Sequence, residues 1–167
     1  QTHCLLKDIT KEKVLKNKLE VNRQLIRSII DNTSDSIYVK DTSGKYLLFN
    51  KAAEKIDGIT AEEVLGKDDF VIFKPEEARL VRSDDRKVMT SKKTIEIIER
   101  LTYNSDDIHD ISSTKGPIFN KDNELIGIFG ISRDITERIK LEEKLEKSLN
   151  EQQLLIDNLQ AGVIIYN

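Results

Sequence analysis

The sequence is poor in the residues that build disulfides, metal sites and rigid turns. Its 167 residues include one cysteine, two histidines, two prolines and no tryptophan. The single cysteine, Cys4, excludes an internal disulfide, and without further ligands around it we expect no metal site. No apolar run approaches the roughly 20 residues that span a bilayer, so we expect a soluble chain without direct membrane contact. The chain starts at Gln1 without a charged-then-apolar leader, and we expect it to be a piece of a longer cytoplasmic protein.

An excess of one charge sign is also missing. The 27 basic and 30 acidic residues give a net charge of −3, which provides no general field for nucleic acid. The length suits one domain with flanking segments rather than two complete domains. Gly-rich phosphate loops, a Ser-His-acid set and zinc-ligand spacing are absent as well. We therefore expect the segment to have no catalytic activity of its own.

The two ends of the chain repeat one another. Asp8-Ile9-Thr10 returns as Asp134-Ile135-Thr136, and Ile30-Asp31-Asn32 returns at the same offset as Ile156-Asp157-Asn158. The repeat predicts one complete unit between the remnants of two neighbours. Residues 1–10 are then the last strand of a preceding unit, and residues 158–167 the first strand of a following one. We expect these remnants to pair with each other or with a neighbouring copy, or the C-terminal one to extend a helix.

Two stretches have the apolar spacing of coiled-coil helices. Residues 11–31 and 137–157 both carry apolar side chains that are four and then three positions apart, and charged residues fill the other faces. We interpret both as linker helices that hold a parallel homodimer. The seam of the first helix consists of Leu15, Leu19, Ile26 and Ile29.

Between these helices the hydrophobic period changes to that of strands. Turn residues at 41–44 and 120–123 separate strand pairs and predict hairpins. The predicted strands cover residues 37–39, 46–49, 94–103, 108–119 and 125–133, and helices are predicted at 51–56, from Thr60 to Gly66 and at 75–90. Paired strands around a helical block exclude a parallel βαβ repeat. They predict an α+β fold with one antiparallel sheet and helices on one face.

A series of short motifs runs through the central residues in a fixed order. They are Asp41-x-x-Gly44, Asn50-x-Ala52-Ala53, Gly58-x-x-x-Glu62-Glu63-x-x-Gly66-Lys67, Lys115-Gly116-Pro117-Ile118 and Gly127 to Thr136. Together these motifs resemble the PAS family of sensory domains over residues 34–137. The resemblance implies a PAS domain at residues 32–136, with a five-stranded antiparallel sheet of strand order 2-1-5-4-3. Helices in this family close over one face and can enclose a pocket.

The inward-facing residues predicted from strand alternation are nearly all apolar. They are Ile37, Val39, Leu47, Phe49, Ile97, Ile111, Ile128, Gly130 and Ser132. Together with the helices they predict a ligand pocket bordered by Val39, Phe49, Ala53, Ile56, Phe70, Leu80, Ile97, Ile111, Ile128 and Ser132. A filled core and a small pocket for an apolar ligand both agree with this lining.

We expect no cofactor in this pocket. In PAS proteins that bind haem, the proximal His lies on the helix that corresponds to residues 75–90, and this helix contains no His. Covalent flavin binding in this family needs a cysteine after the short helix near Phe70, and none is present there. The absence of tryptophan also disfavours non-covalent flavin. His109 could border the pocket, although Asp107 and Asp110 beside it indicate an exposed strand start.

Capping residues stand at both ends of the predicted unit. The amide of Asn50 can cap the helix that follows it. Asp134 and Thr136 stand where the last strand becomes the outgoing helix, and either can cap that helix. The resemblance implies that this joint transmits signals. Phe129 and Ile131 point to the other face of the sheet, and we expect Leu25, Ile26, Ile29 and Ile30 to cover them, from the same chain or from a partner.

The resemblance implies a dimerising sensory relay inside a multidomain bacterial or archaeal signalling protein. Its neighbours would be further PAS domains, and its effector would be a histidine kinase outside this chain. A diguanylate cyclase is the alternative effector. The alternative role is a structural spacer with a filled pocket that senses nothing. An enzyme fragment would need a cluster of polar side chains in a cleft, which the sequence pattern does not predict.

Overall fold

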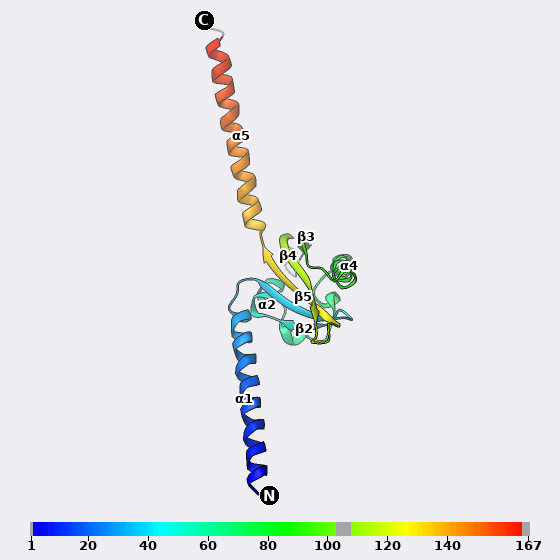
Figure 1. The fold of residues 1–167 in the computed structure, drawn as a ribbon. Coiled ribbons are helices and arrows are strands. Elements are labelled where there is room, and N and C mark those ends of the chain that lie inside the picture. Colours follow the sequence, from blue (N-terminus) through cyan, green and yellow to red (C-terminus); the bar gives the residue numbers. More distant parts are fainter. Residues whose placement is uncertain (1, 103–107, 165–167) are drawn as a thin grey trace.

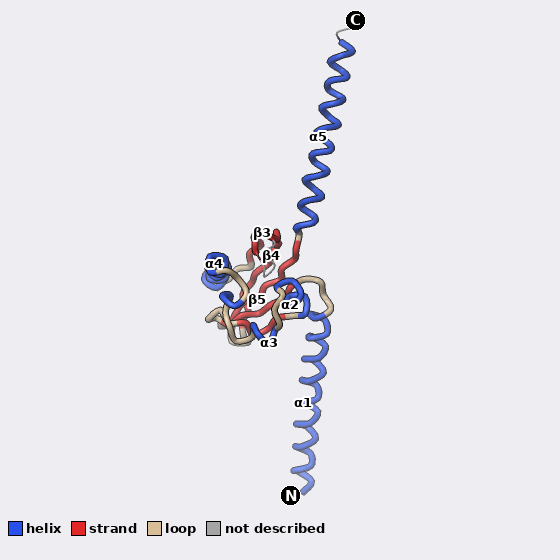
Figure 2. The backbone as a smooth tube through the Cα atoms, turned by 180° about the vertical axis from the view of Figure 1, so that it is seen from behind, coloured by secondary structure: helices blue, strands red, loops and turns tan. Residues whose placement is uncertain are grey.

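The structure, a computed structural model, describes residues 2–102 and 108–164. A sheet with helices on one face forms the body of the molecule (Figure 1), and two long helices extend from it in opposite directions (Figure 2). The incoming helix α1 spans Thr2–Asp31, and the outgoing helix α5 spans Thr136–Ile164. Within these described ranges, no helix combines the length and the apolar character needed to cross a bilayer.

Both ends of the described chain are helical. Residues 2–10, which the sequence predicts as a strand, are the first turns of α1, and residues 158–164 are the last turns of α5. The predicted strand is therefore wrong at residues 2–10. At residues 158–164 the expected alternative, that the C-terminal segment extends a helix, is confirmed, and residues 165–167 lie outside the described residues. The physical reason is that a strand needs a neighbour for its backbone groups, whereas a helix bonds them within itself. The origin of both segments in neighbouring units stays a prediction.

The sheet has five antiparallel strands in the order β2-β1-β5-β4-β3. The strands are β1 Ser36–Asp41, β2 Tyr46–Phe49, β3 Ile95–Thr102, β4 Ile108–Phe119 and β5 Leu125–Asp134. The α+β class, the strand order and the two predicted hairpins are thereby confirmed. β1 pairs with β5 along its whole length, with Ser36 opposite Ser132. Because α1 leads into β1 and α5 leaves β5, the two long helices meet the sheet at adjacent strands.

The helical layer lies between β2 and β3 in the sequence. It comprises α2 Lys51–Asp57, α3 Ala61–Val64, the 3-10 helix η1 Asp69–Val71 and α4 Pro75–Ser91. The predicted caps are confirmed: Asn50 accepts a hydrogen bond from the amide of Ala53, and Thr60 and Glu63 form a capping box. α2 packs on β1, and α4 packs on β4 and β5, which places a core between this layer and the sheet.

Strand β1 turns the opposite side chains inward from those predicted. Tyr38 and Lys40 are buried against the helical layer, whereas Val39 lies on the other face between Leu48 and Phe129. The inward assignments of Ile37, Val39 and Leu47 are therefore wrong, and Leu47 is 59% exposed. Close packing determines which side chains of β1 point inward. A Cβ at Gly130 would lie 2.1 Å from the Tyr38 ring, so only glycine leaves room for the inward-pointing tyrosine.

The outer face of the sheet carries apolar side chains that α1 does not cover. Ile131 is 39% exposed there, and Phe129 lies over Gly116. Leu25, Ile26 and Ile29 of α1 are 58%, 58% and 64% exposed. The expectation that the last turns of α1 cover this face within the same chain is therefore wrong, because α1 extends away from the sheet (Figure 1). Cover by a partner stays a prediction.

Candidate functional site

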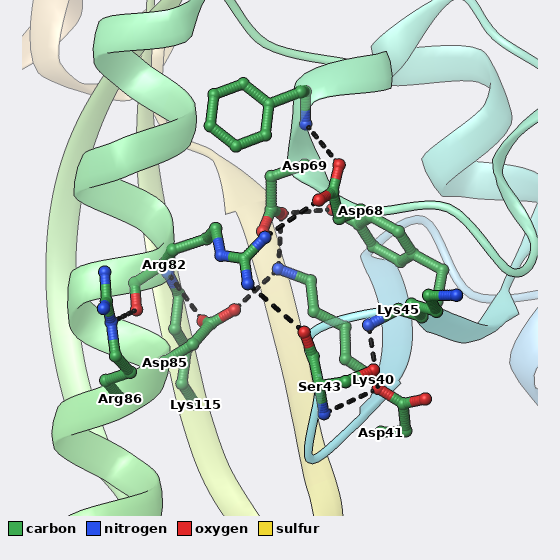
Figure 3. A network of polar contacts seen from close by, with 12 residues as sticks. Lys40, Asp41, Ser43, Lys45, Asp68, Asp69, Arg82, Asp85, Arg86 and Lys115 are labelled. Carbon is green, nitrogen blue, oxygen red and sulfur yellow. Dashed lines mark hydrogen bonds and ion pairs between the residues drawn. The ribbon is translucent and has the colours of Figure 1, made fainter.

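The space between sheet and helices contains a buried ionic cluster (Figure 3). Lys40 of β1 has no solvent exposure, and its Nζ donates to Asp69 Oδ1 at 2.5 Å and to Asp85 Oδ2 at 2.7 Å. The Tyr46 hydroxyl donates to the same Asp69 oxygen at 2.9 Å. Asp69 lies on η1 and Asp85 on α4, so one ammonium group joins the sheet to two elements of the helical layer.

A second buried lysine completes this cluster. Lys115 of β4 is also fully buried, and its Nζ donates to Glu99 Oε1 of β3 at 2.9 Å and lies 3.7 Å from Asp85 Oδ1. Asp85 therefore stands between two ammonium groups. We call Lys40, Lys115, Asp69, Asp85 and Glu99 the buried ionic cluster.

Aromatic rings complete the surroundings of Lys40. Its Nζ lies 5.1 Å from the centre of the Tyr38 ring and 4.8 Å from that of the Tyr46 ring. These distances allow a cation–π attraction, which partly replaces the hydration that Lys40 loses on burial. Burial and the nearby Asp69 carboxylate raise the pKa of Tyr46 well above its ordinary value. Tyr46 thus remains a neutral hydrogen-bond donor.

The buried ionic cluster contains more carboxylates than ammonium groups. Three carboxylates face two ammonium groups, and Asp69 Oδ2 and Asp85 Oδ1 accept no hydrogen bond from any described residue. Charges in a protein interior are tolerated only where opposite charges and hydrogen bonds offset their lost hydration. The cluster therefore requires both lysines to stay in place, and it ties the helical layer to one position on the sheet.

A small cavity lies beside the cluster. Its volume is about 30 Å³, and its lining includes Asp57, Glu99, Lys115 and Ser132. This volume suits one or two water molecules rather than an organic ligand. Asp57, at the end of α2, is buried, and the loss of hydration raises the pKa of its carboxyl to about 7. Within residues 2–102 and 108–164, no group of three or more His, Cys, Asp or Glu is placed to hold a metal ion.

The residues predicted to border one pocket lie in several different parts of the structure. Phe49 and Ser132 line the cavity. Ala53, Ile111 and Ile128 are buried, and Ile56 and Ile97 are half-buried. Val39, Phe70 and Leu80 do not face the interior: Val39 points to the other face of the sheet, and Phe70 and Leu80 are 47% and 67% exposed. Their assignment to a pocket is wrong, because β1 turns Tyr38 and Lys40 inward, and η1 and α4 turn their acidic residues inward.

The sequence reasoning missed the charged residues of the interior. One signal lies on β4: strand alternation predicts that Ile111 faces inward, and Ser113 and Lys115 follow it on the same face of the strand. The same spacing places Glu99 inward together with Ile97 and Leu101 on β3. Hydropathy alone predicts that a lysine points to solvent, since lysines are almost never buried unless they are paired.

The outgoing helix is fastened to the sheet by hydrogen bonds to β4. Asp134 Oδ1 accepts from the amide of Thr136 at 2.9 Å, and its Oδ2 lies 2.6 Å from His109 Nδ1. Thr136 Oγ1 accepts from the amide of Asp110, and the amide of Ile135 donates to the Asp110 carbonyl, both at 2.9 Å. His109 thus lies at this joint and not at the cavity. Partial burial raises the pKa of Asp134, but hydrogen bonds from Thr136 and His109 outweigh it and leave the pKa below its ordinary value.

Both long helices present apolar rows to solvent. Leu15 and Leu19 of α1 are 68% and 61% exposed, and Leu141 and Leu145 of α5 are 63% and 61% exposed. These residues include two of the predicted seam positions and their counterparts on α5. Rows of this kind bury little surface in a single chain, so they are available to a partner.

Comparison with protein families identifies the fold. A family model described as "PAS fold" matches residues 30–140, which is most of the chain. The chain belongs to the PAS fold family. A solved structure of the PAS domain of Bordetella pertussis BvgS is similar to this PAS domain, with a TM-score of 0.62 and 30% sequence identity. The match covers 78% of this chain and 98% of that structure.

Curated relatives of this PAS domain are signalling proteins. The methanogenesis regulatory histidine kinase FilI of Methanothrix harundinacea is 30% identical over 120 residues, which are 72% of this chain and 13% of FilI. A diguanylate cyclase of Vibrio cholerae is 28% identical over 150 residues, which are 81% of this chain and 46% of the cyclase. The chain therefore spans less than half the length of these two relatives.

Proposed function

We propose that this PAS domain is a dimerising relay between two helices of a larger signalling protein. The observation that carries the proposal is the fastening of α5 to β4 through Asp134, Ile135 and Thr136. A helix that is hydrogen-bonded to a sheet at its first turn must follow changes in that sheet. Input would arrive along α1 and leave along α5, at adjacent strands of one sheet.

A histidine kinase is the effector class that we favour, and the whole protein would act in the cytoplasm with further PAS domains beside this one. Support comes from FilI and from the aerobic respiration control sensor ArcB of Escherichia coli, which is 22% identical over 84% of this chain. The diguanylate cyclase relative supports the alternative effector. This segment itself would then be non-catalytic and would bind no nucleic acid.

We further propose that the interior is a filled core rather than a site for an apolar ligand, haem or flavin. Two observations support this reading: the cavity volume is only about 30 Å³, and its lining includes the charged residues Asp57, Glu99 and Lys115. The spacer function remains the second candidate, because a filled interior serves a spacer equally well. The two functions differ in one property: a relay transmits a change in α1 to α5, and a spacer does not.

The homodimer is tested by two glutamates in the seam of α1. Leu19→Glu with Ile26→Glu should convert the purified chain from dimer to monomer, because like charges would face each other across the seam. Light scattering measures the mass. Lys18→Glu with Arg27→Glu reverses two basic side chains next to the seam positions and should leave the dimer intact. An unchanged dimer in the seam variant would place the interface elsewhere.

The joint is tested by Asp134→Ala. Loss of the side-chain acceptor at the start of α5 should lower the free energy of unfolding by about 0.5 to 2 kcal/mol and leave the sheet folded. In the full-length protein the variant should uncouple output from input. Glu142→Ala, which removes an exposed carboxylate from the same helix, is the matched control. If output still follows input in the Asp134→Ala variant, this result contradicts the proposed role of the joint.

A further inference from the structure

A buried asparagine fastens the incoming helix to the domain. The side chain of Asn50 is fully buried and contacts four separate segments. Its Nδ2 donates to the carbonyl of Ile30 in α1 at 2.7 Å and to the carbonyl of Asp35 at 3.0 Å. Its Oδ1 accepts from the amides of Ile37 in β1 and Ala53 in α2, both at 2.9 Å. Both donors and both acceptor positions of the amide are thereby used.

An ion pair continues from this point to the outgoing helix. Arg133 of β5 donates through Nε and Nη2 to the two carboxylate oxygens of Asp35, both at 2.8 Å. The hydrogen bonds from Arg133 lower the pKa of Asp35, so the carboxylate stays ionised at neutral pH. Arg133 is the residue before Asp134, whose carboxylate holds the first amide of α5. Two parallel hydrogen bonds fix the direction of the guanidinium more strictly than one does.

We propose that Asn50, Asp35 and Arg133 form a direct mechanical link between α1 and α5. The link runs from the last turn of α1 through Asn50 to Asp35, and from Asp35 through Arg133 to the first turn of α5. It stays at the end of β1 and β5 and does not pass through the cavity or the buried ionic cluster. The inference rests on the proposed relay and names the residues that transmit its input. They are positioning residues, because each acts by holding another segment.

The chain offers a variant that cuts the link while keeping the cap of α2. Asn50→Asp retains both acceptor contacts, to Ile37 and Ala53, but places a carboxylate oxygen against the carbonyls of Ile30 and Asp35. Arg133→Gln removes the ion pair at the other end of the link. Arg82→Gln is the matched control, since it breaks an Arg–Asp pair with Asp68 that contacts neither long helix.

Amide hydrogen exchange in the purified chain measures the effect. Residues 137–141, at the start of α5, should exchange at least about five-fold faster in Asn50→Asp, the lower end of ordinary coupling between sites. Arg133→Gln should give a similar increase, and the double variant should exchange no faster than the faster single variant. Arg82→Gln should match the wild type over these residues. If Asn50→Asp does not fold, Asp35→Asn takes its place in the same comparison.

Two outcomes would overturn the link: wild-type exchange at residues 137–141 in Asn50→Asp, or effects of the two variants that multiply as independent changes do. The full-length protein separates this failure from that of the relay. If its output responds to changes in α1 in the wild type and equally in Asn50→Asp, the link is wrong and the relay stands. If wild-type output ignores changes in α1, the relay itself is wrong.

Discussion

Lys40→Met should lower the free energy of unfolding at neutral pH by about 3 to 5 kcal/mol, the cost of removing one partner from a buried ion pair. The variant keeps an unbranched side chain of similar volume that ends one atom earlier, and it leaves Asp69 and Asp85 without the ammonium group that lies 2.5 and 2.7 Å from them. Such a loss is a large part of the 5 to 15 kcal/mol by which domains are ordinarily stable. Urea unfolding followed by circular dichroism measures it.

An exposed lysine tests whether this destabilisation comes from the buried ion pairs of Lys40. Lys45→Met is the control: this lysine is exposed in the neighbouring turn, and its loss should change the free energy of unfolding by less than about 0.5 kcal/mol. Equal effects of the two substitutions would show that the cluster adds nothing to the stability of the fold.

Asp57→Asn should stabilise the protein at pH 8 by up to about 4 kcal/mol, because each pH unit between the ordinary pKa of 3.8 and the folded-state pKa of about 7 costs about 1.36 kcal/mol. Burial raises the pKa of this carboxyl from 3.8 to about 7 in the folded state. Between these two values the folded protein holds a proton that the unfolded chain has released. Wild-type stability therefore falls as the pH rises through this window, and the full penalty is present above pH 7. The asparagine side chain has the shape of the protonated acid and carries no charge.

Unfolding free energies at pH 5, 6, 7 and 8 check this prediction. The difference between Asp57→Asn and the wild type should grow from pH 5 to pH 7 and level off towards pH 8. Asp122→Asn, at an exposed turn position, should show no such growth. A difference that is constant with pH would mean that Asp57 is ionised in the folded protein over the whole range.

The fold was predictable because its signals are local. The turn residues around Gly44, the capping box of Thr60 and Glu63 and Pro75 at the start of α4 each act within a few residues, and each occurs where the sequence places it. The order of these signals is also that of the PAS motifs. Strand order then followed from the family resemblance rather than from the residues alone.

The interior was not predictable in the same way because its partners are distant in sequence. The direction of Lys40 depends on Asp69 and Asp85, and on Gly130, which makes room for Tyr38. Strand β1 carries apolar or aromatic side chains on both of its faces between Ile37 and Lys40. Hydropathy therefore favoured the wrong face. The predicted strand at residues 2–10 failed for a related reason, since the backbone groups of this segment are satisfied within a helix.

The relay is tested most directly by shifting α1 and measuring α5. A spin label at Lys144→Cys, in a Cys4→Ser background, reports the distance between the two copies of α5 in the dimer. Four residues inserted between Asn17 and Lys18 change the phase of the α1 seam, whereas seven inserted residues preserve it. We predict that the four-residue insertion changes the distance between the labels and that the seven-residue insertion restores the wild-type distance. An identical distance in all three proteins would show that α5 does not follow α1, and it would contradict the relay.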